Sequence, residues 1–264
     1  MSTPCELILY ASDKLKADKT AQAILHETKR LEKKYNYFDS QSFLSQINQR
    51  EIQTIDQETK TLLQRAAQYY QATHGIFDIT IATFKELYHN SLNTQDLEKE
   101  KNKLMPYVGC EHFSLKKDKV SFDNEYTKID LGGFVKEYAV DRAVQILKKA
   151  KFSSALINFG GDIYALGKKP DNTKFTVGIK DPKNPNVYAK KIQVQDQALC
   201  TSASYERNTQ VGDRTYSHIL SKDTNASLSH SVTVISHNCV ESGVYSTSLM
   251  IDENLSTSNQ IIFL

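Results

Sequence analysis

The sequence predicts an α+β fold, built as one continuous domain over residues 1–264 with mixed sheets and packed helices. Helix-like and strand-like segments follow one another without the strict β-α-β rhythm of a doubly wound parallel sheet. No internal repeat or low-complexity linker divides the chain. At 264 residues, of which 39% are hydrophobic, the chain is long enough to bury a full core.

The first half opens with an apolar run at residues 6–10 that is suited to a strand. Residues spaced mostly by three and four then predict a helix whose buried stripe comprises Ala21, Ile24, Leu25, Thr28, Leu31 and Tyr35. A second helix, ending near residues 74–75, is indicated by Leu62, Leu63, Ala66, Tyr69 and Tyr70. The polar residues 89–104 predict a surface helix and loop.

The second half begins with residues 113–115 and 119–122, which alternate like the two strands of a hairpin. A long helix after Gly133, with one buried face, is predicted by Val135, Ala139, Val140, Ala143, Val144 and Leu147. Strands are predicted at residues 155–159, 175–179, 192–194, 232–235 and 261–264. Residues 181–185 are a turn by composition.

Composition and charge argue against several classes of function. The net charge of +2 gives no strong field toward nucleic acid or an anionic membrane, so we expect no nucleic-acid partner. No apolar run approaches the ~20 residues that a membrane span needs. The start of the chain lacks a signal peptide, so we expect a cytoplasmic protein, or a periplasmic one if this is a trimmed mature form. The cysteines show no C-x-x-C spacing, which argues against the usual zinc sites.

Two glycine-rich segments carry the chemistry: Ile129-Asp-Leu-Gly-Gly-Phe-Val-Lys-Glu-Tyr-Ala-Val-Asp141 and Asn158-Phe-Gly-Gly-Asp162. Glycines let a backbone approach a ligand closely, and a helix N-terminus offers free amide donors to an anion. A lysine in the first segment adds a positive charge. This combination suits a phosphate-bearing ligand, although glycine pairs at tight turns are often purely structural.

Both segments resemble the ApbE-type flavin transferases, the FAD:protein FMN transferases, in which they read roughly D-L-G-G-I-A-K-G-Y-A-V-D and N-x-G-G-D. Further segments match the family in order and spacing: Met1-Ser-Thr-Pro4, Ser42-Phe-Leu-Ser-Gln-Ile-Asn48, Thr73-His-Gly-Ile-Phe-Asp78, Thr201-Ser-Ala-Ser-Tyr-Glu-Arg207, His218-Ile-Leu220 and Ser231-Val-Thr-Val-Ile235. The resemblance covers most of the chain.

The resemblance implies transfer of the FMN half of FAD to a Thr or Ser hydroxyl of an acceptor protein, with Mg²⁺ and release of AMP. It implies that the acceptor carries a flavinylation motif, typically within a membrane redox complex. The positions that match flavin or phosphate contacts in the family are Met1, Phe38, Asn48, Ile76, Phe77, Asp78, Asp130, Lys136 and Leu220. His218 is the candidate catalytic base, since an unperturbed imidazole titrates near neutral pH.

Structural roles remain open for several of these residues. Phe38 and Phe77 are also typical of core aromatic positions. Asp78 suits a turn cap, and Asp130 suits the N-cap of the following helix. Lys136 opposes the macrodipole at the start of a helix, which favours a ligand role.

The implied metal site departs from the family pattern. The family binds Mg²⁺ through a backbone carbonyl, here that of Gly133, and through a late helix with the pattern A-D-A-x-[AS]-T. Ser246 and Thr247 keep their places, but Gly243 stands where the family has Asp. Glu241 does not replace it easily, because two residues along a helix point to nearly opposite sides at about 100° per residue. Alternatively, Gly243 lets its helix pack closely on a neighbour.

Other positions have also changed. Ser221 and Lys222 replace the D-P after H-I-I, Ala203 replaces a Gly, and Glu137 replaces the Gly that follows the lysine. These changes leave two alternatives to an active transferase, which are a catalytically weakened FAD-binding protein and an FAD pyrophosphatase.

Overall fold

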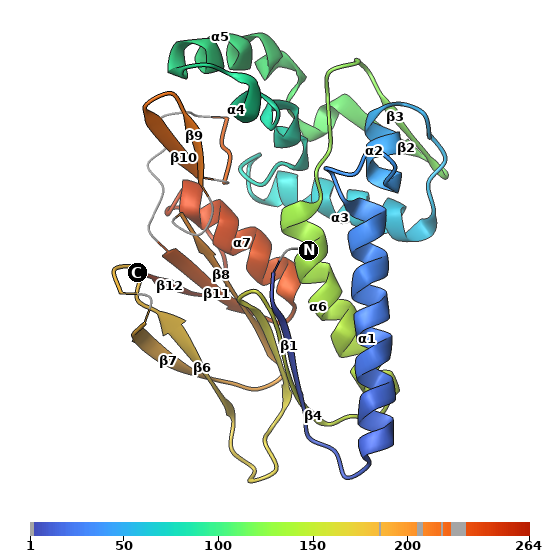
Figure 1. Ribbon diagram of the computed structural model, residues 1–264, viewed down its shortest axis with the longest axis vertical. Helices are drawn as coiled ribbons and strands as arrows, with labels where there is room; N and C mark the ends of the chain where they lie inside the picture. The colour runs from blue at the N-terminus through green and yellow to red at the C-terminus, as the bar shows by residue number, and fades with distance from the viewer. Residues whose placement is uncertain (1–2, 185, 205–207, 218, 223–230) are drawn as a thin grey trace.

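The computed structural model describes residues 3–184, 186–204, 208–217, 219–222 and 231–264. Its centre is a six-stranded sheet in which every neighbouring pair is antiparallel (Figure 1). The strand order is β1 (Cys5–Leu9), β4 (Ser154–Phe159), β5 (Asp162–Gly167), β8 (Gln197–Ala203), β11 (Ser231–Ser236) and β12 (Gln260–Phe263). Since side chains alternate along a strand, the sheet presents two apolar faces.

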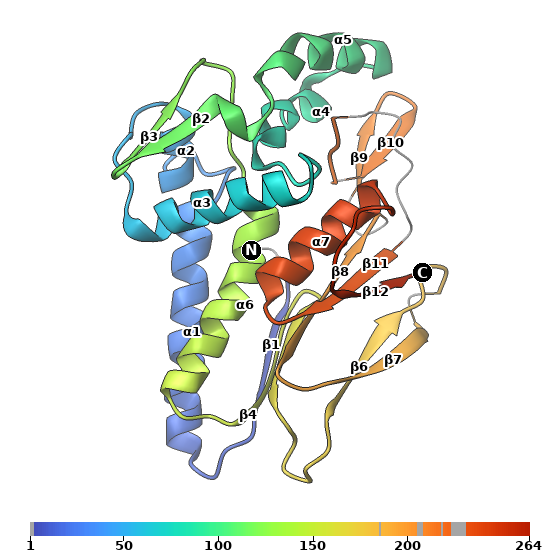
Figure 2. The ribbon, with the colours of Figure 1, turned by 180° about the vertical axis from the view of Figure 1, so that it is seen from behind.

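Helices α6 (Gly132–Lys149) and α7 (Cys239–Ile251) cover one face of this sheet, and α1 (Lys14–Tyr35) packs beside α6 (Figures 1 and 2). Helix α6 lies between α1 and α7 and also contacts β4 and β5. The predicted stripe of α1 buries Ile24, Leu31 and Tyr35. Asp13 caps this helix by accepting a hydrogen bond from the backbone N–H of Lys16.

A hairpin covers part of the opposite face. Strands β6 (Phe175–Lys180) and β7 (Tyr188–Val194) pair with each other and bury Phe175, Val177 and Ile179. These side chains share one apolar cluster with Ala165 of β5 and Leu199 of β8. The sheet is therefore enclosed on both sides.

The remaining elements lie together at one end of the molecule, at the top of Figure 2. They are α2 (Phe43–Asn48), α3 (Gln57–Ala72), α4 (Leu87–Asn90), α5 (Thr94–Leu104), β2 (Phe113–Lys116), β3 (Lys119–Phe122), β9 (Asn208–Val211), β10 (Arg214–Ser217) and the 3₁₀ helices η1 (Ile79–Phe84), η2 (Met105–Tyr107) and η3 (Cys110–His112). Within the described ranges, no helix is both long and apolar enough to cross a bilayer.

The α+β class is confirmed, as are the predicted helices and the strands that alternate clearly. The prediction missed α2, β5, β8 and the β9–β10 hairpin. Strands β5 and β8 are mostly buried on both faces, so they lack the alternation of a half-exposed strand. Helix α2 has six residues, too few for a helical period to show.

An ion-pair network joins α1, α3 and α6. Arg30 of α1 pairs with Glu27 at 2.8 Å and with Glu58 of α3 at 2.6 Å. Arg142 of α6 pairs with Glu27 at 3.0 Å. Hydrogen bonds from Arg30, together with those from Arg142, lower the pKa of Glu27 to about 2.

We predict that Glu27→Gln lowers the free energy of unfolding at pH 7 by about 1.5–3 kcal/mol, the range for a charged hydrogen bond. Because the folded-state pKa of Glu27 lies below its unfolded value, its contribution is present above pH ~4.5 and is lost as the pH falls toward ~2. Urea titrations across this range measure the difference between the two proteins. As a control, Asp18→Asn breaks the exposed Lys14–Asp18 pair and leaves the unfolding free energy unchanged. A Glu27→Gln difference that persists at pH 2 would contradict the assignment.

Candidate functional site

The first glycine-rich segment forms the start of α6. Gly133 has φ −89° and ψ 16°, which rotates its peptide away from the ordinary α-helical ψ of about −42°. A Cβ placed on Gly133 or on Gly161 would meet no atom within 4 Å. Both segments thus leave open space beside the backbone, as a bound ligand requires.

An ion pair joins the two segments. The Nζ of Lys136 on α6 lies 2.8 Å from Oδ2 of Asp162, the residue that ends the second segment. Burial lowers the pKa of Lys136, but the Asp162 and Glu137 carboxylates together raise it by more, so the net shift is upward. Lys136 is therefore held as a cation, and its partner is a carboxylate of the protein.

Phe38 belongs to an exposed aromatic platform, which we define as Tyr37, Phe38, Lys85 and Asp130. The Phe38 side chain is 71% exposed and meets Tyr37 edge to face, with ring centroids 5.5 Å apart. The Nζ of Lys85 lies 4.4 Å from the centre of the Phe38 ring and 2.6 Å from Asp130. A large aromatic ring left in solvent beside a fixed cation is suited to stacking on a planar ligand.

Asp130 and Asn48 position the start of α6. The Oδ1 atom of Asp130 accepts a hydrogen bond of 2.8 Å from the backbone N–H of Gly132. The Asn48 side chain donates to the Ile129 carbonyl and accepts from the Ile129 N–H, both at 2.8 Å. These hydrogen bonds connect the end of α2 to Ile129, the residue before Asp130.

The predicted residues 76–78 lie deeper. Phe77 is buried, and its ring centroid lies 5.8 Å from that of Phe134. Asp78 is the N-cap of η1, accepting hydrogen bonds from the backbone N–H and the hydroxyl of Thr80 at 2.8 and 2.6 Å. The other Asp78 oxygen lies 3.0 Å from the Nζ of Lys222, which replaces the family's Pro. Ile76 and Leu220 are half-buried against apolar clusters.

Three of the predicted metal residues, Gly243, Ser246 and Thr247, lie on α7, and the fourth, Gly133, lies at the start of α6. The Ser202 hydroxyl lies 2.9 Å from that of Ser246 and 3.1 Å from that of Thr247. Ser246 also donates to the carbonyl of Gly243 at 3.1 Å. Glu137 of α6 is buried beside Gly243, and burial together with the Asp162 charge raises the pKa of its carboxyl. In the part of the chain that the structure describes, no three His, Cys, Asp or Glu side chains form a metal cluster.

Two predicted residues, Met1 and His218, fall outside the described residues. Sequence reasoning gave no role to Lys85, Asp162, Ser202 or Glu137, which the structure brings into the site. All except Lys85 lie inside the matched motifs, so motif membership was the available signal.

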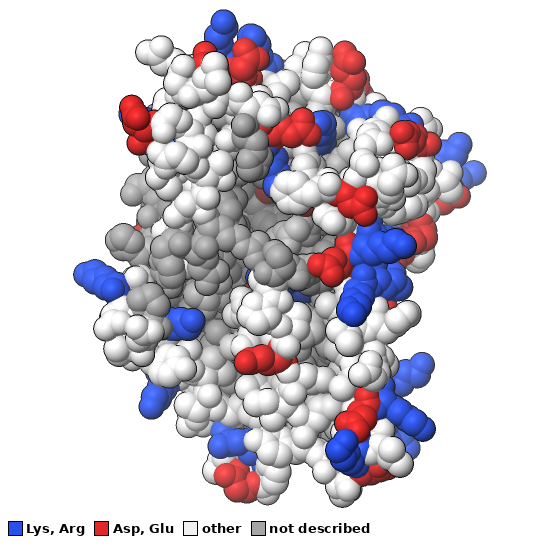
Figure 3. All heavy atoms as spheres, viewed as in Figure 1, with Lys and Arg blue, Asp and Glu red and all other residues white. Residues whose placement is uncertain are grey.

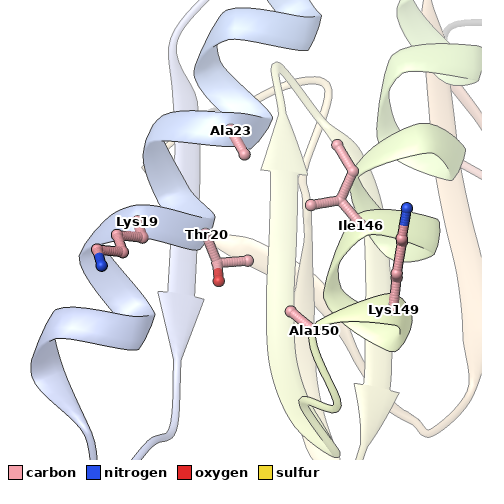
Figure 4. Close-up of a pocket in the computed structure, with 6 residues that line it drawn as sticks. All are labelled: Lys19, Thr20, Ala23, Ile146, Lys149 and Ala150. Atoms are coloured by element: carbon pink, nitrogen blue, oxygen red, sulfur yellow. The ribbon is translucent and has the colours of Figure 1, made fainter.

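A groove away from these residues offers no competing site. It lies between α1 and α6, has a volume of about 370 Å³ and is lined by Lys19, Thr20, Ala23, Ile146, Lys149 and Ala150 (Figure 4). Ile146 follows Gly133 by 13 residues in α6, which corresponds to about 20 Å at 1.5 Å per residue. The groove is shallow, mostly apolar and without a candidate catalytic group.

On the face of the molecule in Figure 3, acidic and basic side chains are interspersed.

The family model described as the ApbE family matches residues 1–258. An FAD:protein FMN transferase of Vibrio cholerae is 24% identical over 221 residues, which cover 80% of this chain and 66% of that protein. One from Klebsiella pneumoniae is 25% identical over 268 residues, which cover 94% of this chain and 79% of that protein.

Solved structures agree in fold. The ApbE protein of Thermotoga maritima matches with a TM-score of 0.84 at 29% identity, covering 94% of this chain and 83% of that chain. The flavin transferase ApbE from Vibrio cholerae matches with a TM-score of 0.82 at 21% identity, covering 100% of this chain and 90% of that one.

Truncation of the two candidate aromatic residues is expected to change the stability of the protein by very different amounts. We predict that Phe77→Ala lowers the free energy of unfolding by about 3–5 kcal/mol, because it empties a buried site. Phe38→Ala changes it by less than about 0.5 kcal/mol, because the ring is exposed. Urea denaturation measures both, and equal losses would show that Phe38 is a core residue.

Proposed function

Since the chain belongs to the ApbE family, we propose that it is an FAD:protein FMN transferase. The acceptor's Thr or Ser oxygen bonds to the phosphorus of the FMN half, the bond from that phosphorus to the bridging oxygen breaks, and AMP leaves. The observation that carries the proposal is the exposed Phe38 ring, which lies beside Lys85 and Asp130 at the open, glycine-rich start of α6.

The proposed binding mode follows from these contacts. The isoalloxazine stacks on Phe38, and the pyrophosphate lies against the open backbone at Gly133. The helix dipole at this end of α6 attracts an anion, although the Gly132 N–H already donates to Asp130. Lys136 adds positive charge, although Asp162 already holds it.

The donor set near Gly243 fits a hard cation, and we propose that this cation is Mg²⁺. The Gly133 carbonyl and the Ser246 and Thr247 hydroxyls are the oxygens that Mg²⁺ accepts. When bound, Mg²⁺ would neutralise charge on the pyrophosphate. Gly243 supplies no side-chain oxygen, so these protein donors are all neutral.

We further propose that His218 takes the proton of the attacking hydroxyl. The acceptor is a protein with a flavinylation motif, within a membrane redox complex. Transfer takes place in the cytoplasm, or in the periplasm if the chain is a trimmed form.

The absence of a carboxylate at Gly243 favours a second candidate, an FAD-binding protein in which transfer is weak. An FAD pyrophosphatase, in which water replaces the acceptor hydroxyl, is a third. A single assay of FMN transfer distinguishes the three candidate functions.

We predict that the protein, incubated with FAD, Mg²⁺ and a peptide with the motif [ST]-[SG]-A-T, yields the FMN adduct and AMP in equal amounts. Mass spectrometry detects the adduct, and chromatography detects AMP. His218→Ala is expected to slow transfer by about 10²–10⁴-fold, the range for general-base catalysis, with FAD affinity unchanged. Free FMN and AMP without an adduct would identify the pyrophosphatase, and FAD binding with no product would identify the binding protein.

We predict that Phe38→Ala weakens FAD binding by about 2- to 10-fold, because it removes one aromatic stacking contact. Phe38→Tyr keeps the ring and retains the affinity of the unmodified protein. Calorimetry with FAD measures each variant. Undiminished affinity in Phe38→Ala would place the flavin elsewhere.

A further inference from the structure

Two departures from the family pattern face each other in space. Glu137 replaces the Gly after the lysine on α6, and Gly243 replaces the Asp on α7. A Cβ built on Gly243 would lie 2.5 Å from Cγ of Glu137 and 3.0 Å from its Cδ and Oε1. The position that lost a carboxylate therefore adjoins the position that gained one, 106 residues away in the sequence.

The two side chains exclude each other. Contacts below 3.0 Å are essentially absent for real Cβ atoms, so any side chain at 243 would have to displace Glu137. Helix α7 carries glycine where the Glu137 side chain fills the space. The alternative reading of Gly243, close packing on a neighbour, is confirmed, and that neighbour is itself a carboxylate.

The Glu137 carboxylate is buried without a full set of partners. Its residue is 5% exposed, and Oε2 has no hydrogen-bond partner among the described residues. Lys136, the neighbouring cation, lies against Asp162 at 2.8 Å. One positive charge thus stands beside two carboxylates, and without a second cation burial favours the neutral, protonated form of Glu137.

The oxygen donors proposed for a cation come from both helices. Glu137 follows Gly133 by one helical turn, and side chains in a helix lean toward its N-terminus, so Glu137 shares a face with the Gly133 peptide. Across from it, Gly243 is followed by the Ser246 and Thr247 hydroxyls, which Ser202 bridges. A carboxylate among neutral oxygens is a donor set that Mg²⁺ or Mn²⁺ accepts.

We propose that Glu137 of α6 is the carboxylate ligand of a divalent cation. In the family pattern, this carboxylate comes instead from the Asp at position 243 on α7. The inference deepens the proposed function, on whose metal requirement it rests. It assigns a ligand role to a residue at which the family pattern has none, and it accounts for both substitutions together.

Three variants test whether the carboxylate ligand has moved from position 243 to position 137, a change that we call the exchange. They are Glu137→Gln, Gly243→Asp, and the transposed pair Glu137→Gly with Gly243→Asp. Mn²⁺ binding is measured by electron paramagnetic resonance, with and without FAD, and the shift in Tm on adding Mn²⁺ is measured in parallel. Glu241→Gln is the matched control, because that carboxylate also lies on α7 but hydrogen-bonds to Asn238 and Asn259.

We expect Glu137→Gln to weaken Mn²⁺ binding by at least about 10-fold, since even outer-shell partners change metal affinity by that much. Gly243→Asp alone lowers Tm without tightening Mn²⁺ binding, whereas the transposed pair recovers affinity to within about 3-fold of the unmodified protein. Glu241→Gln leaves Mn²⁺ affinity unchanged.

Two results would overturn the proposal: undiminished Mn²⁺ affinity in Glu137→Gln, or a transposed pair that binds no better than Glu137→Gln. The FMN transfer assay keeps the two proposals separate. Glu137-dependent Mn²⁺ binding without transfer would reject the proposed activity alone, and transfer that is insensitive to Glu137 would reject the exchange alone.

Discussion

The buried ion pair between Lys136 and Asp162 is the interaction on which the site depends. It connects the first turns of α6 to the start of β5, and so holds the two glycine-rich segments together. Buried pairs of this kind contribute little net stability, because desolvation offsets their attraction, but losing one partner leaves a buried charge uncompensated. The pair therefore serves chiefly to define how the helix start lies on the sheet.

Around this pair, side chains support the backbone that would face a ligand. Asn48 uses both ends of its amide on Ile129, and Asp130 holds the Gly132 N–H while pairing with Lys85. The glycine backbone itself stays open at position 133. A site built in this way is arranged before its ligand arrives, which reduces the entropy lost on binding.

Much of this arrangement could be predicted from local pattern. The α1 stripe and the spacing of the matched motifs depend on residues close together in the chain, and both gave the right elements. Phe38 and Phe77 show the limit of prediction from local sequence. Both match aromatic positions of the family, but Phe38 is exposed and Phe77 is buried, and the residues around them in the sequence do not indicate this difference. Strands β5 and β8 also escaped prediction, since burial on two faces removes alternation. The contact of Glu137 with Gly243 joins residues far apart in sequence, so only the fold reveals it.

That contact also restricts the order in which the two substitutions could arise. With Asp at 243, a glutamate at 137 would meet both a steric overlap and a second negative charge. With glycine at both positions, the helices would face each other across an unfilled space to which neither helix contributes a carboxylate there. The evolutionary route from one arrangement to the other thus passes through an impaired intermediate whichever change comes first. Each substitution is acceptable only in the company of the other, and transferring either one alone into a relative should be harmful.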